Sequence, residues 1–73
     1  MNDEPDWDAG GMGCGELVML LRMRLLPLPP GTRFTVRATD AAAPEDIPAW
    51  CRLTRHALVS ARHPIYVIQR REN

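Results

Sequence analysis

The chain has 73 residues, of which 45% are hydrophobic, and its nine basic residues, all arginine, are balanced by nine acidic residues. The net charge of zero argues against broad electrostatic binding to nucleic acid or to an anionic membrane surface, because both partners favour strongly cationic proteins. A chain this short predicts a single domain, residues 1–73 with an ordered part over about residues 6–70, and leaves no room for a deep enclosed active site.

The first residues and the two cysteines indicate the cellular compartment of the protein. The first residues are acidic and contain no apolar segment that could serve as a signal peptide or cross a membrane. Cys14 and Cys51 are too far apart in the sequence for a metal knuckle or a redox pair, and two cysteines do not make a secreted disulfide framework. We therefore expect a cytoplasmic protein with two free thiols, no metal, no cofactor and no membrane partner.

The first half of the chain predicts three elements. Asp6–Ala9 is a short candidate edge strand, which a glycine-rich stretch then interrupts. Strong helix formers predict a helix over Glu16–Leu26, with leucines at a spacing of four forming its core face and prolines ending it. Thr32–Ala38 alternates between apolar and polar residues and predicts a strand with one buried side.

The second half predicts a helix and a hairpin. Pro44–Arg55 begins with a proline and two acids, as helices often do, and continues with apolar residues at helical spacing. Ala57–Arg62 and Ile65–Arg70 are two strand-like segments joined by two residues. The order βαβαββ predicts an α/β (α+β) two-layer sandwich, with a four-stranded mixed sheet and two helices on one face.

Cys14 is the candidate for chemistry, because it lies where the glycine-rich loop meets a helix start. Free N–H groups and the positive helix end favour a thiolate there. Gly13 and Gly15 leave the sulfur open to a large partner. The residues alone leave two interpretations open, a nucleophilic sulfur and a small buried apolar side chain.

Further residues support a resemblance to the TusA/SirA/YedF family of small sulfur carriers, over about residues 7–70. They are Asp8, Gly11, Met12, Cys14, Glu16, Val18, Arg22, Pro30-Gly31, Ala38-Thr39-Asp40, Asp46-Ile47-Pro48-Ala49-Trp50-Cys51 and His56. The resemblance implies the same fold, and a cysteine that takes sulfane sulfur as a persulfide from a protein donor, a cysteine desulfurase or rhodanese, and relays it to a protein acceptor. It implies that Cys14 carries the sulfur and that Asp8, Gly11 and Glu16 shape its loop.

The chain departs from the family's Cys-Pro-x-Pro signature, since it has Cys14-Gly15-Glu16-Leu17. Because both prolines of the signature are absent, the loop is less restricted in conformation than in the family and has two more amide donors near the sulfur. This departure keeps a second hypothesis open, a non-catalytic interaction or regulatory module on the same scaffold. A third, a thiol redox sensor, lacks a resolving cysteine nearby in the sequence.

Several other side chains have a functional and a structural interpretation. Met12, Met19 and Met23 could contact a partner, together with Arg22 on the exposed side of the first helix, but we favour simple core packing for the methionines. Cys51 is predicted in the core. His56 is predicted beside the negative end of the second helix, and nothing in the sequence brings it or His63 to Cys14. Dispersed arginines predict a solvated face and no direct nucleic-acid binding.

Overall fold

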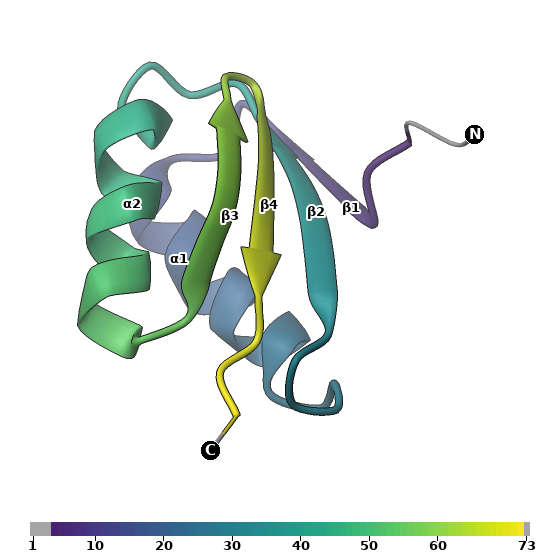
Figure 1. The fold of residues 1–73 in the computed structure, drawn as a ribbon. Helices are drawn as coiled ribbons and strands as arrows, with labels where there is room; N and C mark the ends of the chain where they lie inside the picture. The colour runs from purple at the N-terminus through teal and green to yellow at the C-terminus, as the bar shows by residue number, and fades with distance from the viewer. Residues whose placement is uncertain (1–3, 73) are drawn as a thin grey trace.

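The structure, a computed structural model, describes residues 4–72. Four strands and two helices follow one another in the order βαβαββ (Figure 1). The elements are β1 (Trp7–Gly10), α1 (Cys14–Leu25), β2 (Arg33–Ala38), α2 (Ala43–Thr54), β3 (Ala57–Arg62) and β4 (Ile65–Gln69). The predicted fold class is confirmed. Residues 1–3 and 73 of the predicted domain lie outside the described residues.

The four strands form one mixed sheet in the order β1-β2-β4-β3. β1 lies at the edge, as predicted, and pairs with β2 in parallel, whereas β2 with β4 and β3 with β4 are antiparallel pairs. A register shift between Leu58 and Ser60 leaves Val59 outside the regular pairing of β3, with 40% of its surface exposed. Val59 accordingly lies outside the core cluster of the described residues.

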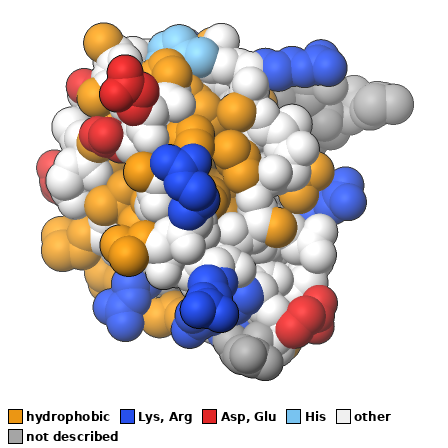
Figure 2. Space-filling model, turned by 60° about the vertical axis from the view of Figure 1, so that its left-hand side comes forward, with side chains coloured by type: hydrophobic (Ala, Val, Ile, Leu, Met, Phe, Trp, Pro, Cys, Tyr) orange, Lys and Arg blue, Asp and Glu red, His pale blue; other side chains and the backbone are white. Residues whose placement is uncertain are grey.

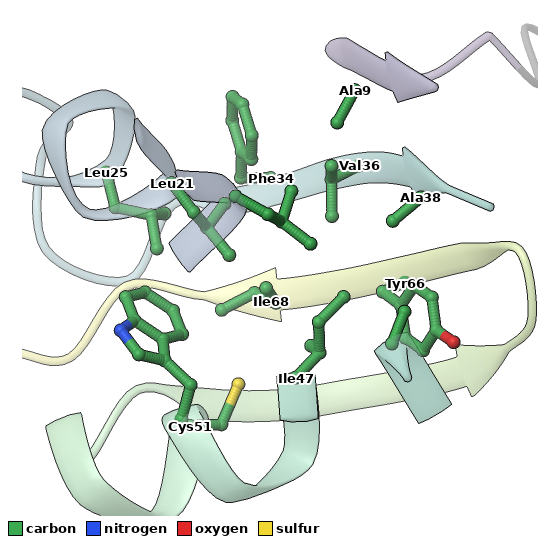
Figure 3. Packing of buried hydrophobic residues seen from close by; sticks show 13 residues of the cluster. Ala9, Leu21, Leu25, Phe34, Val36, Ala38, Ile47, Cys51, Tyr66 and Ile68 are labelled. Carbon is green, nitrogen blue, oxygen red and sulfur yellow. The ribbon is translucent and has the colours of Figure 1, made fainter. Parts of the chain in front are cut away.

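Both helices cover the same face of the sheet. Leu17, Leu21 and Leu25 of α1 are fully buried, as their spacing predicts. On α2 the buried side chains are Ala43, Ile47, Trp50 and Cys51. They pack with Phe34, Val36, Ala38, Tyr66 and Ile68 of the sheet in one cluster, much of which Figure 3 shows at close range. Cys51 is thus a core residue, as predicted.

The start of α1 differs from the prediction. The helix begins at Cys14 rather than at Glu16, because its first backbone hydrogen bond runs from the Leu17 N–H to the Gly13 carbonyl. Gly15 has low helix propensity, but the first-turn N–H groups have no intrahelical partner in any helix, so a glycine there interrupts no bond. Cys14 is consequently the first residue inside the helix.

The favoured core packing of the methionines is wrong for two of the three. Met19 and Met23 of α1 have 57% and 62% of their surface exposed. The three buried leucines already fill the side of α1 that faces the sheet, so the methionines lie outside that stripe. Met12, in contrast, is half-buried and packs against the core cluster.

Candidate functional site

The loop between β1 and α1 leads to Cys14, the first residue of α1, and is tied to the segment that follows β2. The Asp8 carboxylate accepts the N–H of Gly10 at 2.9 Å. Gly10 has a positive φ of 57°, which suits glycine, and its carbonyl accepts the N–H of Thr39 at 2.9 Å. Since Asp40 follows Thr39 in the chain, this tie brings Asp40 beside the residue that begins α1.

The Cys14 thiol is hydrogen-bonded to a carboxylate. Its Sγ–H donates to Oδ2 of Asp40 at 3.3 Å, and the side chain is half-buried. Burial, hydrogen bonds to Asp40 and Asp46, and the charges of these two acids together raise the pKa of the Cys14 thiol to about 12. The prediction of a thiolate at the helix start is therefore wrong for the free protein.

The full negative charges of two carboxylates oppose the partial positive charge of the helix end. The N-terminus of a helix carries about half an elementary charge, and Cys14 lies beside that positive end. Two carboxylates, each a full negative charge when ionised, lie close enough to oppose it. The sulfur is nevertheless not walled in, because half-burial leaves part of the side chain at the surface.

Asp40 contacts the thiol, but the sequence analysis named it only within the family resemblance and not as a site residue. Its Oδ2 also accepts the N–H of Ala42 at 3.0 Å, and its carbonyl accepts the N–H of Ala43 at 3.0 Å. These two bonds orient the carboxylate in the turn before α2. Asp40 and Asp46 both belong to the segments that carry the family resemblance, and this was the signal that could have identified them.

Tyr66 approaches the site from the sheet. Its side chain is buried, and its hydroxyl is hydrogen-bonded to Nδ1 of His63 at 2.6 Å. Burial raises the pKa of the Tyr66 hydroxyl, and so does the charge that Cys14 carries once it is deprotonated. His63 is therefore linked to the neighbourhood of the thiol through Tyr66, which the sequence did not indicate.

A pocket opens beside the thiol, between the two helices. Its volume is about 290 Å³. It is lined by Cys14, Gly15 and Val18 of α1 and by Asp46, Ala49, Trp50 and Leu53 of α2. Leu53 has 83% of its surface exposed. Figure 2, turned so that the α2 side of Figure 1 comes forward, shows hydrophobic side chains at the surface, acidic ones mainly toward the upper left, and arginines in the middle and along the bottom.

The other predicted loop residues lie around Cys14 in different ways. Asp8 is exposed and forms an ion pair with Arg37 at 3.3 Å, so it supports the loop from the sheet side rather than facing the sulfur. Gly11 lies near Thr39, whereas added side-chain carbons at Gly13 and Gly15 would meet nothing within 4 Å. Glu16 lies exposed in the first turn of α1.

The predicted contact residues lie along α1 or just before it. Arg22, Met19 and Met23 are exposed on the helix that starts at the thiol, and half-buried Met12 precedes it. None of these four residues lines the pocket. Within residues 4–72, no three His, Cys, Asp or Glu side chains are grouped as ligands for a metal ion. Over the same residues, no helix is both long and apolar enough to cross a membrane.

Comparisons with known proteins show which sequences this chain is similar to. The family model for "Sulfurtransferase TusA" matches residues 6–69. A "Sulfur carrier protein TusA" of Pseudomonas fluorescens (strain SBW25) is 44% identical over 52 residues, which cover 71% of this chain and 63% of that protein. The protein of that name in Pseudomonas syringae pv. tomato is 42% identical over 53 residues, covering 73% and 63%. The chain thus spans about 63% of the length of these curated relatives.

Proposed function

The chain belongs to the sulfurtransferase TusA family, and from this premise we propose that it is a sulfur carrier that holds sulfane sulfur as a persulfide on Cys14. The observation that carries the proposal is the position of Cys14, which is half-buried, is the first residue of α1 and lines an open pocket. A sulfur placed there can be reached by a second protein. The donor would be a cysteine desulfurase or a rhodanese, and the acceptor another protein.

The transfer conserves atoms and electrons without an oxidant. The Cys14 sulfur, once deprotonated, attacks the outer sulfur of the donor's persulfide and forms a new S–S bond. The donor's S–S bond breaks, and the donor sulfur leaves as a thiolate that takes up the proton lost by Cys14. The products are a persulfide on Cys14 and a free thiol on the donor. Delivery to the acceptor repeats these steps in the opposite direction.

The reducing cytoplasm is the compartment that fits this role. Both cysteines are free in the structure, and a carrier thiol has to stay unpaired between transfers. Cytosolic thiols are kept reduced, whereas exported proteins acquire disulfides. We therefore place the proposed activity in the cytoplasm.

Mass measurement after incubation with a sulfur donor tests the function. The protein is incubated with a cysteine desulfurase and cysteine, and its mass is then recorded without a reducing agent. We expect the mass of one sulfur atom to be added to the wild type and to Cys51→Ala, but not to Cys14→Ser. Cys51→Ala is the matched control because the Cys51 side chain lies in the core.

Two outcomes would contradict the proposal. A wild-type protein that gains no sulfur would favour the non-catalytic module on the same scaffold, for which the missing prolines at Gly15 and Leu17 are the motivating observation. An equal gain in Cys14→Ser would show that another residue carries the sulfur.

A further inference from the structure

In the free protein the Cys14 thiol lies beside the Asp40 carboxylate. The Asp40 carboxylate accepts the Sγ–H of Cys14 at 3.3 Å and is held in place by the N–H of Ala42. Such an acceptor stabilises the thiol, because a thiolate has no hydrogen to donate and would face a second negative charge. We propose that Asp40 is a positioning residue that keeps Cys14 as a protonated, slowly reacting thiol until a partner engages it.

The surroundings of the sulfur support this assignment. Asp46 of α2 is a second carboxylate that faces Cys14, and Tyr66 of β4, bonded to His63, is a further titratable group near it. Deprotonated Cys14 would lie among two acids and a hydroxyl, and no arginine within residues 4–72 is among the groups that shift its pKa. The physical consequence is protection, since the thiolate, not the thiol, reacts with peroxides and electrophiles.

The inference takes Cys14 as the sulfur-bearing residue, and so rests on the proposed function, but alkylation tests it without any sulfur transfer. The rate of iodoacetamide reaction is measured from pH 6 to pH 10 for wild type, Asp40→Asn and the matched control Glu45→Gln. Glu45 is an exposed acid at the start of α2, next to Asp46. Alkylation is assigned to Cys14 by mass spectrometry of the tryptic peptide that ends at Arg22.

The expected result is faster alkylation after loss of the carboxylate. In Asp40→Asn the apparent pKa of Cys14 falls, and the rate at pH 8 rises about threefold for each unit of that fall. The factor is less than ten because a thiolate of lower pKa is also a weaker nucleophile. Glu45→Gln should follow the wild-type profile. An Asp40→Asn rate equal to or below that of wild type overturns the inference, and so does an apparent pKa of 9.0, the ordinary value, or lower in wild type.

A second measurement keeps the inference testable if Asp40→Asn does not fold. Wild type is modified with a cationic and with an anionic methanethiosulfonate reagent, and the ratio of the two rates is compared with that of a short unstructured cysteine peptide. The carboxylates beside Cys14 should raise the ratio several-fold in favour of the cationic reagent. An unchanged ratio overturns the inference. If persulfide loading fails while the iodoacetamide and methanethiosulfonate results are as expected, the proposed function is rejected and this inference is not.

Discussion

At the scale of single residues, the structure assigns opposite protonation behaviour to a thiol and an imidazole. Cys14 keeps its proton because burial and the nearby carboxylates disfavour the thiolate. His56 loses its proton easily because it is 5% exposed, lies near Arg70 and Arg71, and its Nδ1 accepts the N–H of Arg71 at 3.0 Å. His56 follows the end of α2, as predicted. There its neutral ring accepts a hydrogen bond and does not act as a cation beside the negative helix end.

The buried His56 predicts a loss of stability in mild acid. Burial, followed by the charges of Arg71 and Arg70, lowers its pKa below the ordinary value of 6.5. The unfolded chain therefore binds more protons than the folded one between pH 6.5 and the folded-state pKa. The free energy of unfolding falls as the pH drops through this window. Urea unfolding followed by circular dichroism at pH 7.5 and pH 5.5 measures the change.

His56→Asn is the variant that isolates this effect. Its amide oxygen can still accept the Arg71 N–H, but it does not titrate. We expect this variant to be less stable at neutral pH and to lose less stability than wild type between pH 7.5 and pH 5.5. From pH 7.5 to pH 8.5, above the window, the two proteins should change in parallel. An equal acid loss in both would show that another group controls it.

At the scale of secondary structure, α1 combines a core stripe with an exposed face. The three fully buried leucines attach it to the sheet, and the Arg24 guanidinium lies over the Trp7 ring of β1 at 4.4 Å from the ring centre. Met19 and Met23 lie exposed on the same helix. The helix can therefore tolerate change on its outer face and not on its inner one.

Alanine substitutions on the two faces of α1 should have very different effects. Leu21→Ala removes a fully buried side chain and should lower the free energy of unfolding by about 2–5 kcal/mol. For a domain this small, such a loss is a large share of the total stability. Met23→Ala, on the exposed face, should change it by less than about 0.5 kcal/mol. Midpoints of urea unfolding compare the two, and similar midpoints would contradict the packing described for α1.

At the scale of the whole molecule, the packing of both helices on one face of the sheet creates the pocket. Its wall carries Val18 of α1 and Trp50 and Leu53 of α2, and Leu53 projects into solvent. An apolar side chain this exposed buries little surface within the described residues, so it adds little to their stability. It does offer apolar contact area to a partner beside the thiol. We therefore expect the partner to cover this pocket during transfer.

Leu53→Ser tests whether the pocket is the contact surface. We expect it to slow persulfide loading from a protein donor several-fold, mainly through a higher KM, and to leave the alkylation of Cys14 and the urea midpoint close to those of wild type. Val59→Ser is the matched control, because Val59 is an exposed apolar residue of β3 that does not line the pocket. Loading by Leu53→Ser at the wild-type rate would exclude this surface.

The sequence by itself determined the element order, the fold class, the buried stripe of α1 and the alternating strand β2, because these follow from local periodicity and from prolines and glycines at element ends. It also singled out Cys14. Only the tertiary structure decided the protonation of that sulfur, since Asp40, 26 positions away, and Asp46 reach it only after α2 has packed beside α1. It likewise decided which methionines are exposed, because the space available to a side chain depends on its neighbours in the folded molecule.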